Sequence, residues 1–331
     1  MLPNHLTRTL GATALATLLA GPALAQDPLT IGFIYPSPVA DVGWAAELNN
    51  GRLAVEEHFG DQVRTLFVEN VPEGPDAARI MNQMAAQGAD MIMLGSFGYM
   101  NDGLRLAQQN PDMTFIHASG YEVAPNFGNF QSRNYESSYL VGMAAGDVTE
   151  TDTIGIVAAY AIPEVIGMIN AFTLGIQEIN PDATVRVVWL NSWFDPPKAQ
   201  ESARALQAQG ADVVYSLYQD TPSVVTVAEE EGFWVINTSS DMKEYAPTWL
   251  LASQVADWES YFVESVQASI DGTFEGSAFW GGMADGTVDV LSYADAISDE
   301  TMARIEEATA ALRAGDFHPL TGPVMDQDGT E

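Results

Sequence analysis

The chain has 331 residues, 47% of them apolar and 17% charged, which is enough for two globular domains with a large core. It carries 12 Lys and Arg against 45 Asp and Glu, and a net charge of −33 argues against nucleic acid or anionic membrane surfaces as partners. The absence of cysteine excludes disulfides and thiolate chemistry.

The first 25 residues differ from the rest of the chain. Arg8 precedes a short apolar run, ATALATLLAGPALA, which ends in small residues at positions 23–25. This pattern is typical of a secretory signal peptide, with cleavage expected between Ala25 and Gln26. No cysteine follows the cleavage point to accept a lipid, so the sequence predicts a freely diffusing periplasmic protein.

The first half of the mature chain alternates short apolar strands with helices. Strands are predicted in the runs IGFI, VRTLFV, MIML and TFIHA, which begin at residues 31, 63, 91 and 114. The run RIMNQMAA before the third strand spaces its apolar residues like a helix, and QGAD follows it. A helix that stops at Gly and leads into a short buried strand is one unit of a parallel α/β sheet.

The second half repeats this series at a nearly constant offset. IGFI at residue 31 matches IGIV at 154, an offset of 123, and QGAD at 87 recurs at 209, an offset of 122. The two VR dipeptides, at 63 and 185, also differ by 122, and the strands at 115 and 235 differ by 120. Accidental similarity between α/β strands is the alternative, but the repeated QGAD and VR favour a duplication.

The duplication predicts two similar lobes, in which residues 31–120 match 154–241. We expect the chain to cross between the lobes near residues 125–135 and 250–285. The first lobe is then assigned residues 26–130 plus about 255–282, and the second lobe 131–254 plus about 283–331.

The sequence offers little that indicates catalysis. His58, His117 and His318 are far apart, and none has the spacing of a metal ligand. The chain has no glycine-rich phosphate loop, no G-x-G-x-x-G after the first strand and no G-x-S-x-G elbow. We therefore expect no catalytic residue, no metal and no cofactor, and the chain is not predicted to be an enzyme.

Aromatic residues are frequent in the loops that follow the predicted strands. In a parallel α/β sheet, ligands bind at the carboxyl ends of the strands. Flat apolar walls with a few carboxylates suit a planar heteroaromatic ligand, although any one ring could instead anchor its loop on the core. The candidate ligand-binding residues on this ground are Trp44, Phe97, Tyr121, Trp193, Phe194, Asp220 and Asp241.

The mature chain resembles the basic membrane protein family, the substrate-binding proteins of ABC importers related to purine-nucleoside receptors. The resemblance rests on the runs NSWFDPPKAQESARALQAQGADVVY, SSYLVGMAAGDVTETDTIGIVAA, INAFTLGIQEINPDATV, NTSSDM and LTGPVMDQDG. It implies a type I periplasmic binding protein, an α/β fold with two similar Rossmann-like lobes joined by a hinge. It also implies a small-molecule ligand and an ABC permease as partners, and we expect a monomer.

The resemblance assigns roles to four of the candidates. Family members hold a purine between aromatic rings, and Trp193 stands at the position of a stacking Phe. Trp44 stands at the Phe of the family's D-x-x-F-N motif, and Phe97 matches the aromatic residue after the third strand. Asp241 matches an acidic residue of the family's DSD turn, which holds the sugar or the base.

Three departures from the family pattern bear on the ligand. Ala45 replaces the Asn of D-x-x-F-N, and the segment from Met283 replaces L-K-E-G-G and its pocket lysine. The lipoprotein cysteine is missing as well. Because two polar side chains of the family's pocket are lost, a bare purine base fits better than a nucleoside. A nucleoside or riboflavin receptor is the alternative within the family, and an exported nucleoside hydrolase is the alternative outside it.

Overall fold

The structure is a computed structural model that describes residues 27–323 and 330. The predicted signal peptide, residues 1–25, lies outside the described residues. Within the described part of the chain, no helix has the length and apolar character needed to cross a bilayer.

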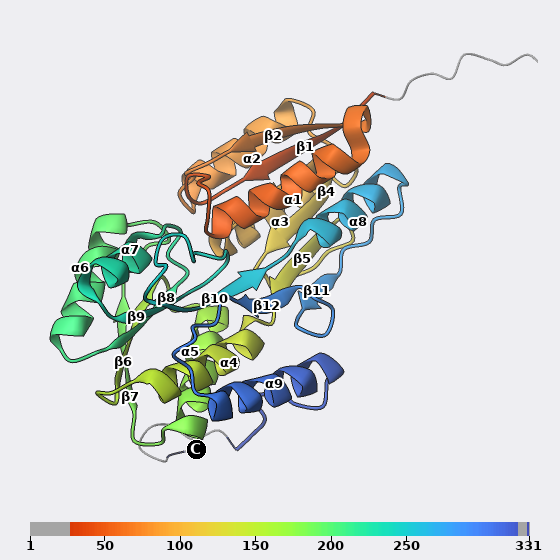
Figure 1. Ribbon diagram of the computed structural model, residues 1–331. Coiled ribbons are helices and arrows are strands. Elements are labelled where there is room, and N and C mark those ends of the chain that lie inside the picture. The colour runs from red at the N-terminus through yellow and green to blue at the C-terminus, as the bar shows by residue number, and fades with distance from the viewer. Residues whose placement is uncertain (1–26, 324–329, 331) are drawn as a thin grey trace, which may run out of the picture.

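A six-stranded sheet in the order β11-β5-β4-β3-β1-β2 forms the centre of the first lobe (Figure 1). Each neighbouring pair of its strands runs parallel. The strands are β1 (Leu29–Ile34), β2 (Val63–Val68), β3 (Met91–Leu94), β4 (Thr114–Ala118), β5 (Phe127–Ser132) and β11 (Ala278–Gly281). All residues of β3 and β4 are buried, as expected for parallel strands covered on both faces.

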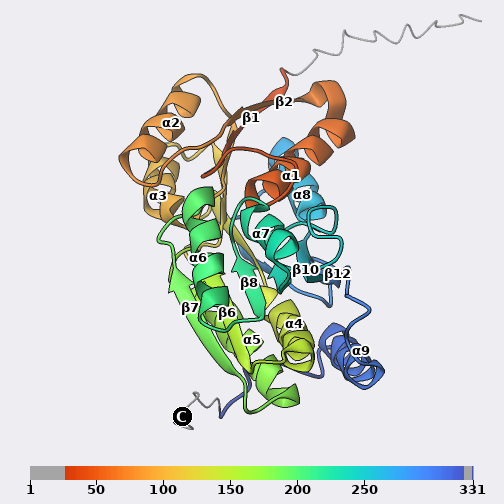
Figure 2. The same ribbon diagram turned by 60° about the vertical axis from the view of Figure 1, so that its left-hand side comes forward.

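Two pairs of helices cover the two faces of this sheet. Figure 2 shows α1 and α8 on one face and α2 and α3 on the other, and each pair belongs to a separate apolar cluster. The helices are α1 (Trp44–Phe59), α2 (Pro75–Ala86), α3 (Met100–Gln109) and α8 (Glu259–Ile270), with short 3-10 helices η1 (Gly60–Gln62) and η2 (Phe97–Tyr99).

The second lobe has a sheet of the same design, in the order β12-β10-β9-β8-β6-β7. Its strands are β6 (Thr153–Ala158), β7 (Thr184–Trp189), β8 (Val213–Leu217), β9 (Trp234–Asn237), β10 (Leu250–Ala256) and β12 (Val288–Leu291). Helices α6 (Pro196–Ala208) and α7 (Ser223–Glu231) cover one face. The other face is covered by α4 (Asn134–Val148), α5 (Pro163–Ile179) and α9 (Asp299–Ala314).

The two sheets correspond strand for strand, which confirms the predicted two-lobed α/β fold. Reading from β2 to β11 in one sheet and from β7 to β12 in the other gives the same order of connections. The last strand is the exception, because β11 runs parallel to β5 whereas β12 runs antiparallel to β10. β5 ends at Ser132 and β10 at Ala256, in each case two residues beyond the lobe boundary drawn from the sequence.

The repeated QGAD has the same structural role in both lobes. Gly88 and Gly210 follow α2 and α6 with φ of 83° and 99°, a left-handed conformation that favours glycine. The carboxylate of Asp90 then accepts a hydrogen bond from the backbone N–H of Thr30, at 2.8 Å. Asp212 accepts one from the N–H of Glu150, at 2.6 Å. Each copy therefore stops a helix. Asp90 ties the next strand to β1, and Asp212 ties it to the turn just before β6.

Helices α4 and α5 pack with their backbones in close contact. A methyl group added at Gly142 of α4 would overlap the carbonyl oxygen of Phe172, and one at Gly175 of α5 would overlap that of Tyr139. Backbone atoms cannot move aside as a flexible side chain can, so both positions need glycine. Gly167, also in α5, has open space around it.

We expect Gly175→Ala to destabilise the protein by about 1–3 kcal/mol, because the added methyl group forces the two helices apart. Gly167→Ala, in the same helix but at a position with open space around it, should instead stabilise the protein by about 0.5–1 kcal/mol. This is the usual gain from Gly to Ala inside a helix. Chemical denaturation of the two variants measures both changes. Equal effects would mean that the helices do not pack in this way.

Candidate functional site

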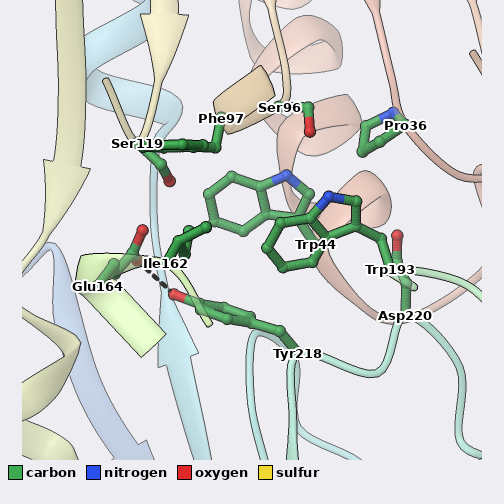
Figure 3. Close-up of a pocket in the computed structure, with 10 residues that line it drawn as sticks. All are labelled: Pro36, Trp44, Ser96, Phe97, Ser119, Ile162, Glu164, Trp193, Tyr218 and Asp220. Carbon is green, nitrogen blue, oxygen red and sulfur yellow. Dashed lines mark hydrogen bonds between the residues drawn. The ribbon is translucent and has the colours of Figure 1, made fainter. Parts of the chain in front are cut away.

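A pocket lies between the two lobes, at the carboxyl ends of strands from both sheets (Figure 3). Its space, including the part open to solvent, is about 410 Å³. The first lobe contributes the start of α1 and the loops after β1, β3 and β4, and the second lobe the loops after β6, β7 and β8. The lining residues are Pro36, Trp44, Ser96, Phe97, Ser119, Ile162, Glu164, Trp193, Tyr218 and Asp220.

The Trp44 side chain is fixed by contacts within and between the lobes. Its indole N–H donates to the carbonyl oxygen of Gly95 at 2.8 Å. The ring of Tyr218, from the other lobe, meets the indole edge-on at 5.6 Å between ring centres. Because the single polar atom of the indole is satisfied by the backbone, its faces are left for apolar contacts.

Trp193 reaches from the second lobe towards the first. Its indole N–H donates to Glu73 Oε1 at 3.2 Å, and the same oxygen accepts from Ser96 Oγ at 2.6 Å and from the N–H of Gly98 at 2.9 Å. The ring also contacts Tyr160, at 4.9 Å between ring centres. Figure 3 shows the two indoles in the middle of the pocket, between Phe97 and Tyr218.

Asp220 joins the two lobes beside the pocket. The carboxylate follows β8 in the second lobe and accepts hydrogen bonds from Ser37 Oγ and from the N–H of Ala45, in the first turn of α1. A carboxylate at a helix N-terminus is favoured by the free N–H groups there. Burial nevertheless raises the pKa of Asp220 to about 6, and the hydrogen bonds from Ser37 and Ala45 lower it only in part.

Glu164 is the other carboxyl group that lines the pocket, in the first turn of α5. Tyr218 Oη donates to its Oε1 at 2.6 Å, and Ser119 and Asn134 also form hydrogen bonds with it. Burial raises the pKa of Glu164, and these three hydrogen bonds lower it in part. Ser119 and Tyr218 have φ of 58° and 53°, and such left-handed conformations outside glycine concentrate at functional sites.

The lobes are in direct contact around the pocket, so the structure represents a closed form. The N–H of Gly43 donates to Ser240 Oγ at 2.8 Å, and Ser240 donates to Glu47 Oε1 at 2.5 Å. Val42, from the first lobe, is buried in an apolar cluster of the second lobe that includes Leu190. Separation of the lobes would break these contacts and expose the pocket.

The structure brings four of the seven sequence-predicted residues together in the lining: Trp44, Phe97, Trp193 and Asp220. Tyr121 is 66% exposed and lies outside the lining, although its ring is 6.4 Å from that of Phe97. Phe194 is 37% exposed and also lies outside the lining.

Asp241 is not brought to the pocket. Its side chain is exposed and accepts hydrogen bonds from Ser292 Oγ at 2.7 Å and from the N–H of Lys243 at 3.1 Å. The chain turns outward after β9, so that Ser240 faces the first lobe and the next residue faces away. Matching a turn between sequences places the turn but does not fix which of its side chains points inward.

Sequence reasoning did not select Glu164 and Tyr218. Both lie in loops that follow predicted strands, AYAIPE and YQDTPS, so the position alone pointed to them. The carboxylates predicted from the sequence to bind the ligand are Asp220 and Asp241, and Glu164 is not among them. A proline followed by an acidic residue at the start of a helix, as in Pro163-Glu164, was the available signal.

Comparison with known proteins shows which family has this architecture. The model of the family "ABC transporter substrate-binding protein PnrA-like" matches residues 29–311. A purine-binding protein of Brucella abortus (strain 2308) is 37% identical over 320 residues, which cover 97% of this chain and 91% of that protein. A putative ABC transporter glucose-binding protein of Haloferax volcanii is 36% identical over 305 residues, 92% of this chain and 77% of that protein.

A solved structure supports the fold. The solute-binding protein of an ABC transporter system from Aeropyrum pernix K1 superposes with a TM-score of 0.77 at 17% identity. The superposition covers 88% of this chain and 93% of that one. Similarity at this level of identity shows that the two proteins share the fold.

We expect the closed form to be favoured as the pH falls. The pKa of Asp220 is raised from 3.8 to about 6 in the closed form, so closure there takes up a proton. The equilibrium should therefore shift towards the closed form as the pH falls from about 6 to 3.8, and it should not shift further below this range. Small-angle scattering of the ligand-free protein, above and within this window, would show the radius of gyration decrease.

Asp220→Asn provides the control, because an amide keeps the shape of the carboxylate but does not titrate. Its radius of gyration should depend less on pH than that of the wild type. Glu47 and Glu164, whose pKa values burial also raises, account for the response that remains. An identical pH response in both proteins would contradict a role for Asp220 in closure.

Proposed function

Since the chain belongs to the PnrA-like family of ABC transporter substrate-binding proteins, we propose that its ligand is a purine base and that it delivers this base to a membrane permease. The single observation that carries this proposal is the pair of indoles, Trp44 and Trp193, that line one pocket from opposite lobes. Stacking of an aromatic side chain on a base is worth about 1–3 kcal/mol. A planar ligand between the two lobes gains both contacts only when the lobes are closed.

The polar groups of the pocket also favour a base. Glu164 and Asp220 offer carboxyl oxygens, and Ser96 and Ser119 offer hydroxyl groups, so ring N–H and exocyclic amine groups can find acceptors. A ribose brings further hydroxyl groups, and each one left unpaired costs about 1–3 kcal/mol. Ala45, which stands in place of the family's Asn, is fully buried and offers no polar side chain.

A sugar is the second ligand class to consider, because the Haloferax volcanii relative carries glucose in its name. A hexose needs hydrogen-bond partners for hydroxyl groups all around its ring. Five of the ten lining residues here are Pro36, Trp44, Phe97, Ile162 and Trp193, which offer apolar surface. The walls therefore suit a flat ring better than a polyol, and glucose belongs in the binding test.

The setting of this function follows from the sequence. We propose that the N-terminal signal peptide exports the chain to the periplasm, where it acts as a diffusing monomer. Closure of two lobes over a ligand is the motion expected for such receptors. Incubation with a purine nucleoside tests the alternative of an exported hydrolase, since a receptor returns the nucleoside intact and a hydrolase releases the free base.

Trp193→Ala should weaken purine binding by about 1–3 kcal/mol, the value of a lost aromatic–base stack, with little change in melting temperature. Trp193→Phe keeps a stacking ring but loses the hydrogen bond to Glu73, so it should retain most of the affinity. Titration calorimetry measures both variants.

Phe194→Ala is the matched control, because this neighbouring ring lies outside the lining and its loss should leave the affinity nearly unchanged. If Trp193→Ala unfolds the protein while the folded fraction binds normally, Trp193 is an anchor of its loop and not a ligand contact.

Adenine, guanine or hypoxanthine should bind at least about tenfold more tightly than the matching nucleosides, because ribose hydroxyl groups find few hydrogen-bond partners in this pocket. Calorimetry with bases, nucleosides, riboflavin and glucose under one condition makes the comparison. Equal or tighter binding of adenosine or guanosine would replace the base by the nucleoside as the ligand. Binding of glucose or riboflavin alone would contradict the purine proposal.

A further inference from the structure

All the charge that can form in the pocket is negative. Of the ten lining residues, all in the described part of the chain, Glu164 and Asp220 carry carboxyl groups and none is Lys, Arg or His. A third carboxylate, Glu73, contacts both Ser96 and Trp193 of the lining. Ala284, which stands where the family has its pocket lysine, is exposed and carries no charge.

Two of these carboxylates, Asp220 and Glu73, accept hydrogen bonds that hold the closed form together. Asp220 accepts hydrogen bonds from Ser37 and from the first turn of α1, which partly offset its charge. Glu73 is an exposed side chain at the rim and accepts three hydrogen bonds through one oxygen. Both carboxylates therefore already have hydrogen-bond partners within the protein.

Glu164 differs from Glu73 because it lines the pocket, and it differs from Asp220 because its hydrogen bonds come from side chains and not from a backbone N–H at a helix start. Its hydrogen bonds come from Tyr218, Ser119 and Asn134, which are all neutral groups. Two of these three partners, Ser119 and Tyr218, are held in left-handed backbone conformations, so the surroundings of the carboxyl group are built at a cost in backbone energy.

A partly buried carboxyl group without a positive partner treats ligands of different charge unequally. It is either negative or, after taking up a proton, neutral, and it can never become positive. A cationic ligand pairs with the negative form, and the water-poor pocket strengthens this attraction. An anionic ligand gains nothing from either form and loses its own hydration. Aromatic faces add to the preference, since they attract cations and not anions.

We propose that this cleft selects its ligands by charge, taking cationic rings in preference to neutral ones and excluding anionic ones, and that Glu164 is the residue that sets this selectivity. The inference rests on the proposed purine function and narrows it. It names neutral and positively charged purines as the ligand class, and it excludes nucleotides and purines that carry a carboxylate or an ionised ring.

The test uses three purines of nearly the same shape that differ in charge. Purine-6-carboxamidine is cationic at neutral pH, purine-6-carboxamide is neutral and purine-6-carboxylate is anionic. We expect the cation to bind about tenfold more tightly than the neutral amide, and the anion about tenfold more weakly, in titration calorimetry at one pH and salt concentration.

Glu164→Gln removes the charge and keeps an oxygen that accepts from Tyr218. In this variant the cation should lose its advantage over the amide, and the anion should recover about tenfold relative to the amide. Glu201→Gln, which makes the same change of charge on an exposed face of α6, should leave both ratios as in the wild type. Melting temperatures of the two variants show that any difference does not come from loss of folding.

The outcomes separate this inference from the proposed function. If the bases bind but the cationic, neutral and anionic purines bind alike, or if Glu164→Gln leaves the ratios unchanged, the selectivity proposal is wrong and the purine receptor stands. An anion that binds neither protein is excluded by shape, which also contradicts the role of Glu164. If adenine, guanine and hypoxanthine all fail to bind, the purine function itself is wrong.

Discussion

The contact between Asp220 and the start of α1 is the interaction on which the site depends. A buried carboxylate from one lobe reaches the N–H of Ala45 and the hydroxyl of Ser37 in the other, at the point where the chain enters the helix. Trp44 is the first residue of that helix, so the same contact fixes where its indole stands. Closure of the lobes and formation of the aromatic wall are therefore one event, and the pocket exists only when the two sheets face each other.

The duplicated architecture explains how one design gives two different walls. Gly95 and Tyr218 occupy equivalent positions, each directly after the third strand of its lobe. Gly95 has no side chain and presents its carbonyl oxygen to the indole of Trp44. Tyr218 presents its ring to the same indole and its hydroxyl group to Glu164. Equivalent backbone positions thus carry different chemistry, and the function comes from the departures from internal symmetry.

The carboxyl groups of the cleft are costly to the empty protein. Burial raises the pKa of both Asp220 and Glu164, which means that their charged forms are disfavoured where they stand. Asp220 recovers part of this cost through Ser37 and the start of α1, and Glu164 recovers part through hydrogen bonds from three neutral side chains. A ligand that donates hydrogen bonds or carries positive charge would offset the remainder, so ligand binding and closure reinforce each other.

The sequence by itself determined the number of lobes, the alternation of strands and helices along the chain and the loops that follow the strands. These follow from local patterns: strands at offsets of 120–123, and a glycine in each QGAD that stops a helix. Trp44, Phe97, Trp193 and Asp220 could be chosen because the carboxyl ends of parallel strands share one edge. Only the tertiary structure decided which side chains of a loop point inward. Asp241 faces out to Ser292, while Glu164 and Tyr218 face in, because side-chain direction depends on backbone torsions and on the opposite lobe, which no local pattern records.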